Sequence, residues 1–73
     1  MNSVQNNEMT KEASLIEPGH RLICVNPVQG IYKGRCYVAA SYIDPGVIEI
    51  TELDGTPVGC YQAGRFCIDW NAF

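Results

Sequence analysis

The clearest alternation of apolar and polar side chains runs through residues 47–53. Ile48 and Ile50 fall on one side of an extended chain, and Glu49 and Thr51 fall on the other. A period of two residues is typical of a half-buried β-strand and does not fit a helix. The centre of the chain is therefore expected to be a strand with Ile48 and Ile50 facing the core.

Turn-forming residues bound this strand on both sides. Pro45-Gly46 precedes it and predicts a type II turn, because proline fixes φ and glycine accepts a positive φ. Asp54-Gly55 follows it and favours a two-residue type I′ loop, which would return the chain through a strand over residues 56–61. Pro57 lacks an amide donor, which suits the start of a strand or an edge position.

Three further strands complete the pattern. Residues 20–25 are apolar on both faces, which predicts a strand with neighbours on both sides. Residues 35–43 also alternate, but either face could point inward. Near the C-terminus Phe66, Ile68 and Trp70 are expected to share one side of a last strand, after a short 3₁₀ turn at residues 62–64.

Two segments lie outside these strands. The loop at residues 26–34 carries Val28, Ile31 and Tyr32, so it is expected to fold back over the domain. Residues 1–17 are polar and predict a leader that is either disordered or partly helical, with Thr10 as the N-cap of a short helix that could dock on the domain.

Together these elements predict an all-β fold. Five short strands with tight turns and one longer early loop are typical of a small five-stranded barrel. The barrel is assigned to residues 18–73 and the leader to residues 1–17.

Composition narrows the function. The 73 residues carry a net charge of −3 and only five basic side chains, so a nucleic-acid partner is disfavoured. No apolar run approaches the roughly 18 residues of a membrane-spanning helix, and no secretory signal is visible, which predicts a cytoplasmic protein without a membrane partner. A domain of this size has no room for a cofactor cavity, so no cofactor is expected.

The chain has four cysteines, Cys24, Cys36, Cys60 and Cys67. In a reducing compartment disulfides are rare, and free cysteine is among the most buried residue types. The spacing also lacks the close Cys-x-x-Cys pairs of structural zinc sites. Buried thiols are therefore the favoured interpretation, with disulfides and a metal site as the alternatives.

Several short motifs follow one another in a recognisable order: Ile23-Cys24-Val25, a turn-rich loop, Gly34-Arg35-x-Tyr37, Asp54-Gly55, Tyr61 and Arg65-Phe66. This order resembles small SH3-like β-barrel proteins of bacteria and their phages over roughly residues 21–68. The resemblance implies a barrel and specifies no partner. Many of those proteins have no assigned activity, and some phage-encoded ones are thought to bind and modulate host proteins.

Catalysis is not expected. The single histidine, His20, stands at a strand entrance with no nucleophile motif beside it. Asp44 and Asp54 are explained by turn chemistry, and Glu49 by the solvent face of its strand. Glu52 falls on the same side of the extended chain as Ile48 and Ile50. Because it stands at the end of the strand near a turn, it can escape burial.

A protein-binding surface is the better hypothesis, because a small barrel cannot enclose all seven aromatic rings and exposed aromatic and arginine side chains dominate interface energetics. The function predicted is a non-catalytic binding module, and a phage-encoded modulator or inhibitor of a host protein is one form it could take. The alternatives are a homodimer that pairs through residues 23–25 or 47–50 and, third, a weak nucleic-acid-binding barrel. The candidate binding residues are Tyr32, Arg35, Tyr42, Arg65, Trp70 and Phe73.

Overall fold

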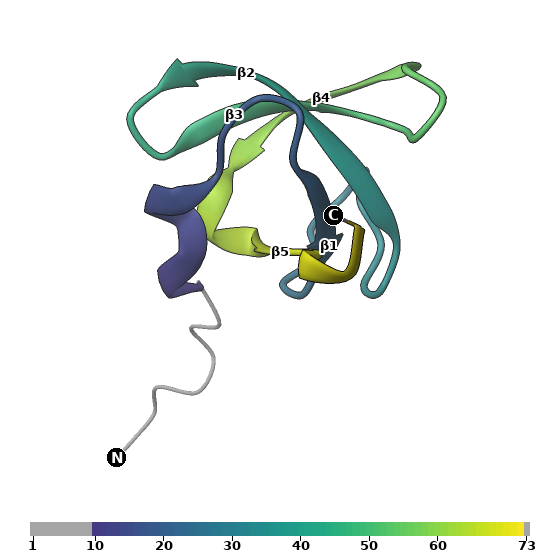
Figure 1. Ribbon diagram of the computed structural model, residues 1–73. Helices are drawn as coiled ribbons and strands as arrows, with labels where there is room; N and C mark the ends of the chain where they lie inside the picture. Colours follow the sequence, from purple (N-terminus) through teal and green to yellow (C-terminus); the bar gives the residue numbers. More distant parts are fainter. Residues whose placement is uncertain (1–9, 73) are drawn as a thin grey trace.

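The computed structural model describes residues 10–72, and five antiparallel strands in one sheet dominate it (Figure 1). The order across the sheet is β4-β3-β2-β1-β5. The strands are β1 Arg21–Cys24, β2 Cys36–Asp44, β3 Val47–Thr51, β4 Pro57–Gln62 and β5 Phe66–Ile68. The all-β prediction and the five strands are thereby confirmed. No helix within residues 10–72 is long and apolar enough to cross a membrane.

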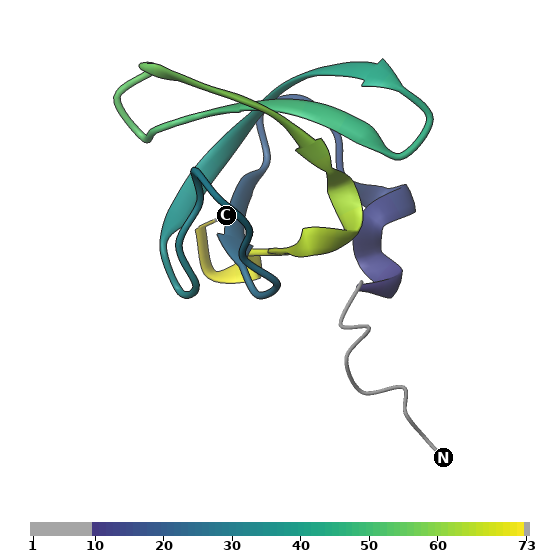
Figure 2. The same ribbon diagram turned by 180° about the vertical axis from the view of Figure 1, so that it is seen from behind.

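The sheet curls strongly but stays open. Strands β4 and β5 are its two edges, and the short 3₁₀ turn η3 (Ala63–Arg65) carries the chain from one edge to the other (Figures 1 and 2). The predicted 3₁₀ turn is thus present, whereas the strands do not close into a ring. Strand β1 pairs with both β2 and β5, as its two apolar faces predicted.

The core fills the inside of the curl. Side chains from β1, β2, β3 and β5 contribute to it, together with residues from the leader, the early loop and η3. Its members are Ile16, Leu22, Cys24, Ile31, Tyr37, Ala39, Ile48, Ile50, Ala63, Phe66 and Ile68. The rings of Tyr37 and Phe66 pack edge to face, with centroids 6.1 Å apart. The burial of Ile31 confirms that the early loop folds back over the domain.

Strand β2 shows why its inward face could not be chosen from the sequence. Tyr37 and Ala39 point into the core, but the register with β3 shifts between Ala39 and Ser41 and again between Tyr42 and Asp44. Each extra residue of a β-bulge reverses the side-chain alternation. A single alternating pattern therefore does not describe the whole strand.

The two predicted turns have different outcomes. Asp44 and Val47 pair across Pro45-Gly46, and Gly46 has φ +81°, as the type II prediction required. The predicted two-residue loop at Asp54-Gly55 is wrong. The Gly55 N–H donates to the Glu52 carbonyl at 2.9 Å, and the Glu52 N–H donates to the Thr56 carbonyl at 2.8 Å. Glu52 and Thr56 thus enclose a loop of three residues, Leu53 to Gly55. Within it, the Asp54 side chain accepts a hydrogen bond from the Thr56 N–H.

The leader packs on the domain where the structure describes it. A 3₁₀ turn, η2 (Lys11–Leu15), lies beside η3, and Ile16 after it is fully buried (Figures 1 and 2). Thr10 occupies the N-cap position but makes no side-chain cap bond. Of the two alternatives for the leader, residues 10–16 follow the docked one. The predictions for residues 1–9 and for Phe73 lie outside the described residues.

Two further expectations need correction. Trp70 does not extend the last strand: β5 ends at Ile68, and Trp70 begins the 3₁₀ turn η4 (Trp70–Ala72) with 54% of its surface exposed. Residues 23–25 and 47–50 do not provide a free sheet edge either, because β1 and β3 each have a strand on both sides. The strands at the two edges of the sheet are β4 and β5.

Candidate functional site

The start of β2 and the loop between β3 and β4 hold an exposed ion pair. The Arg35 Nε–H and Nη2–H groups both donate to Oε1 of Glu52, at 3.2 and 2.9 Å. The hydrogen bond to Glu52 raises the pKa of the Arg35 guanidinium above its ordinary value, so the group stays cationic. An ion pair this exposed contributes little to folding stability. Its two charged groups can therefore pair with charges of a partner at little cost to the fold.

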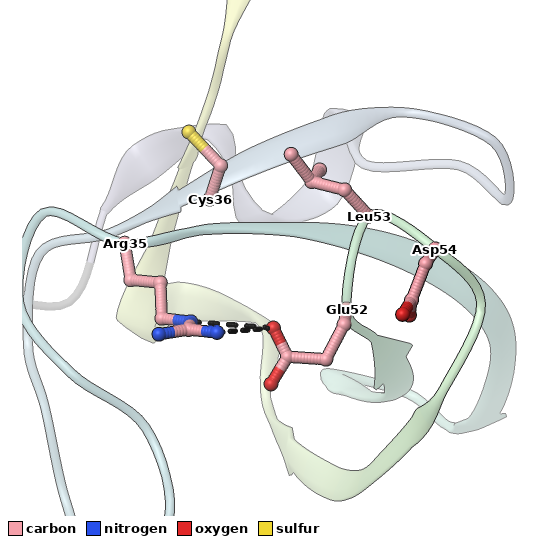
Figure 3. Close-up of a pocket in the computed structure, with 5 residues that line it drawn as sticks. All are labelled: Arg35, Cys36, Glu52, Leu53 and Asp54. Atoms are coloured by element: carbon pink, nitrogen blue, oxygen red, sulfur yellow. Dashed lines mark hydrogen bonds and ion pairs between the residues drawn. The ribbon is translucent and has the colours of Figure 1, made fainter.

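An open pocket of about 380 Å³ surrounds this pair. Figure 3 shows the side chains of Arg35 and Glu52 pointing toward one another, whereas Cys36 and Leu53 point away from the pair on the other side of the chain. Asp54 completes the lining. The pocket therefore combines an ion pair, a second carboxylate and one exposed apolar side chain, Leu53.

The Asp54 carboxylate has a local structural role as well. It accepts a hydrogen bond from the Thr56 N–H at 2.9 Å, and this bond lowers the pKa of Asp54 below its usual range. The negative charge at this end of the pocket is therefore kept down to low pH. It adds to the charge of Glu52 and leaves the pocket with more carboxylates than cations.

Tyr32 flanks the pocket from the early loop. Its carbonyl accepts a hydrogen bond from the Arg35 N–H at 3.1 Å, and its N–H donates to the hydroxyl of the buried Tyr37 at 3.1 Å. Both the N–H and the carbonyl of Tyr32 are thus hydrogen-bonded, while 66% of the surface of the residue is exposed. A large ring on a fixed backbone loses little conformational entropy on binding.

The early loop itself is fastened to β4. The Tyr61 hydroxyl donates to the Gln29 carbonyl at 3.2 Å. A Cβ atom on Gly30 would lie 2.2 Å from the same hydroxyl oxygen, so the ring is pressed against the glycine. This contact holds the loop that carries Tyr32.

The other predicted binding residues do not join Tyr32 and Arg35. Tyr42 lies near the far end of β2 and is 45% exposed. Arg65 ends η3, and its Nη1–H donates to the Asn26 carbonyl at 3.2 Å, which gives it a structural contact. Trp70 lies in η4 beyond β5. Of the five predicted binding residues within residues 10–72, the structure therefore brings only Tyr32 and Arg35 together.

Trp70 belongs to a different set of contacts, centred on Glu12 of the leader. One Glu12 oxygen accepts the Ile68 N–H at 2.7 Å, and the other accepts the Trp70 indole N–H at 3.2 Å. The Thr10 hydroxyl donates to the Phe66 carbonyl. Two leader side chains thus satisfy the outer edge of β5 in the way a neighbouring strand would.

Trp70 also lies edge to face against His20, with ring centroids 6.3 Å apart. The Nδ1 atom of His20 accepts the Glu17 N–H at 3.0 Å. His20 therefore holds the segment that joins the leader to β1.

All four thiols are free, but their environments differ. Cys24 is buried, Cys36 and Cys67 are partly buried, and Cys60 is exposed. The prediction of buried thiols is thus wrong for Cys60. Burial raises the pKa of the Cys24 thiol, and burial together with the charge of Glu12 raises that of Cys67. Within residues 10–72 no group of three or more His, Cys, Asp or Glu side chains is placed to hold a metal ion.

Comparison with known proteins gives no relative: no family model, no curated protein and no solved structure matches the chain.

Sequence reasoning missed Glu52 and Leu53 as parts of the site. Glu52 stood out only as a strand-end residue that escapes burial, and Leu53 only as the last residue of a strand. The signal that could have found them is the antiparallel register of β2 with β3. Because Val38 faces Thr51, the residues before Val38 must lie beside those after Thr51. That register follows from the bulge in β2, which the sequence does not announce.

Proposed function

We propose that the chain is a non-catalytic, SH3-like protein-binding module that acts through the pocket at the start of β2. Its binding surface, the Arg35 surface, consists of Tyr32, Arg35, Glu52, Leu53 and Asp54. The sequence resemblance to SH3-like barrels of bacteria and phages supports this fold, with a seam between β4 and β5 that η3 spans. The same resemblance supports a role as a modulator or inhibitor of a host protein.

The observation that carries the proposal is the combination of exposed groups around the pocket. Tyr32 leaves 66% of its surface in water and is joined through its backbone to Arg35, whose ion pair is itself open to solvent. Leu53, on the other side of the chain, leaves 53% of its surface in water (Figure 3). Aromatic and arginine side chains supply much of the binding energy at protein interfaces. Charges at the border of an apolar contact guide association and select partners more than they add affinity.

A capture experiment tests the proposal. Tagged full-length chain is incubated with a bacterial lysate, and the proteins retained by the wild type are compared with those retained by a Tyr32→Ala/Arg35→Ala double variant. Lys33→Ala is the matched control, because Lys33 is the exposed neighbour of Tyr32 in the same loop and is not part of the Arg35 surface. The proposal expects a specific partner that the double variant loses and the control keeps.

A charge exchange separates recognition from local stability. The double variant Arg35→Glu/Glu52→Arg retains an ion pair but reverses its direction. If the partner reads the charge of Arg35, the exchange abolishes capture, while thermal unfolding stays close to that of the wild type. Identical capture by the wild type, the alanine variant and the exchanged variant would remove the Arg35 surface from consideration.

A further inference from the structure

Within residues 10–72, the two edge strands differ in whether other parts of the chain bind their outward backbone groups. On β5, Glu12 accepts the outward N–H of Ile68 and Thr10 donates to the outward carbonyl of Phe66. On β4, no described residue outside β3 makes a hydrogen bond to the backbone of Cys60 or Gln62. One edge is thus capped by the leader and the other is uncapped by the part of the chain that the structure describes.

The register shows which groups of β4 point outward. In an antiparallel ladder, the N–H and C=O groups of alternate residues point toward the neighbouring strand and those of the residues between point away from it. The Ala63 N–H donates to the Gly46 carbonyl at 2.7 Å, so Ala63 points toward the β2–β3 hairpin. Counting back, the N–H and C=O groups of Cys60 and Gln62 point away from β3.

The first half of β4 is less suited to pairing. Pro57 has no N–H group, and the register with β3 shifts between Ile50 and Thr51, which leaves Val58 as the extra residue before Gly59. Proline and bulges are both devices that limit pairing at a sheet edge. Any strand added to β4 is therefore centred on Cys60, near the η3 end.

We propose that β4 pairs antiparallel with β4 of a second copy of this chain, about a two-fold axis at Cys60. Residues 57–62 contain no charged side chain, whereas the whole chain carries −3. Two-fold pairing about Cys60 sets residue 61 against residue 59 and residue 62 against residue 58 of the other copy, so a strand without charges brings no two like charges together across the pair. A neutral edge is thus a place where two copies of an acidic protein can meet without repulsion.

This register makes a specific chemical prediction. Cys60 of one copy faces Cys60 of the other as a hydrogen-bonded pair, for which Cα atoms lie about 5.5 Å apart. A disulfide spans Cα separations of roughly 4.4–6.8 Å and needs Cβ atoms about 3.5–4.5 Å apart, so the two Cys60 side chains must move closer than the ordinary spacing of such a pair when the bond forms. Cys60 is also the one exposed thiol among the four cysteines. Mild oxidation with copper phenanthroline would therefore join the copies: two Cys60 thiols release two protons, lose two electrons to the copper oxidant and form one S–S bond.

Gln62 offers a variant that removes only an outward donor. Its φ of −65° is the value that proline imposes, and Tyr61 before it is already in a strand, so Gln62→Pro fits the backbone. The N–H that proline lacks is one that points away from β3. Gln62→Ala is the matched control, because it loses the same side chain and keeps the N–H.

The test is sedimentation of the full chain under reducing conditions over a concentration series up to millimolar. The expected result is a monomer–dimer equilibrium that Gln62→Pro weakens about tenfold or more relative to Gln62→Ala, since two-fold symmetry removes two hydrogen bonds at once. On oxidation the wild type is expected to give a covalent dimer, which Cys60→Ser prevents and Cys36→Ser does not. Circular dichroism confirms that each variant is folded.

Three results would overturn the proposal. The first is a monomer at every concentration with no covalent dimer on oxidation. The second is a dimer that Gln62→Pro and Gln62→Ala weaken equally, or that oxidation links through Cys36 or Cys67, because it would use another face. The third is a monomer whose Gln62→Pro variant loses a different captured protein, which would assign the edge to that partner. Tyr32→Ala/Arg35→Ala is expected to leave the dimer unchanged, so this inference and the proposed function fail separately.

Discussion

Gly30 is the position where one added methyl group tests the packing of the early loop most directly. Its φ is +99°, a conformation that L side chains rarely adopt, and a Cβ atom there would lie 2.2 Å from the Tyr61 hydroxyl oxygen. No real Cβ contact is that short, so Gly30→Ala must displace the tyrosine ring or the loop. Either movement breaks the hydrogen bond from Tyr61 to the Gln29 carbonyl.

The expected cost has two parts. Placing alanine in the left-handed region costs about 1–2 kcal/mol at any position. Loss of the tyrosine hydrogen bond and of part of its packing adds about 1–2 kcal/mol. Gly30→Ala is therefore expected to lower the free energy of unfolding by about 2–4 kcal/mol, a large part of the stability of a small domain.

Two comparisons isolate the second part. Gly34 has φ +84°, and a Cβ atom added to it would have no neighbour within 4 Å, so Gly34→Ala carries only the backbone cost. Tyr61→Phe removes the hydroxyl and leaves the ring carbon at 3.4 Å as the nearest atom to a Cβ on Gly30, which is ordinary contact. In the Tyr61→Phe background, Gly30→Ala is expected to cost about as much as Gly34→Ala, roughly 1–2 kcal/mol.

Urea denaturation followed by circular dichroism measures all four proteins and the double variant. The double-mutant cycle is expected to give a coupling energy of about 1–2 kcal/mol between Gly30 and Tyr61. The reasoning fails if Gly30→Ala and Gly34→Ala cost the same, or if Tyr61→Phe does not reduce the cost of Gly30→Ala. Either result would mean that the ring does not hold the early loop.

Further predictions concern the leader and the thiols. Ile16→Ala is expected to lower the free energy of unfolding by about 2–4 kcal/mol in urea melts, because the side chain is fully buried, whereas an unchanged midpoint would show that the leader does not pack. Glu12→Ala leaves the Ile68 N–H unsatisfied and should cost about 1–2 kcal/mol and alter the fluorescence of Trp70, the single tryptophan; Glu12→Gln, which keeps an acceptor, should do less. With a maleimide, Cys60 should react at once in the native protein and Cys24 only on unfolding; equal rates would contradict the burial of Cys24.

Some parts of the fold could be predicted from the sequence because they depend on local chemistry alone. Pro45-Gly46 specified its turn through the φ values that proline and glycine prefer, and the alternation around Ile48 and Ile50 specified the inward face of β3. The apolar residues on both faces of 20–25 predicted that β1 would be a central strand. In each case the deciding residues lie within a few positions of one another.

The candidate site depended on longer-range information. Tyr32 and Arg35 were predicted as binding residues because aromatic and arginine side chains dominate interface energetics. Arg35 meets Glu52, seventeen residues later, only through the register of β2 with β3. Tyr42 and Trp70 looked equivalent to Tyr32 by composition, and the structure places them on other elements. Exposure of an aromatic ring can be expected from the sequence, whereas the neighbours of that ring cannot.

The sequence by itself determined that this chain forms short antiparallel strands, where most of them lie, and that some aromatic side chains must remain in water. Only the tertiary structure decided that the sheet stays open, that leader side chains cap β5, and that β4 is left as the edge with outward backbone groups. The physical reason is that strand formation depends on the local alternation of side chains. Edge pairing depends on which distant backbone groups the bulges and turns bring within hydrogen-bonding distance.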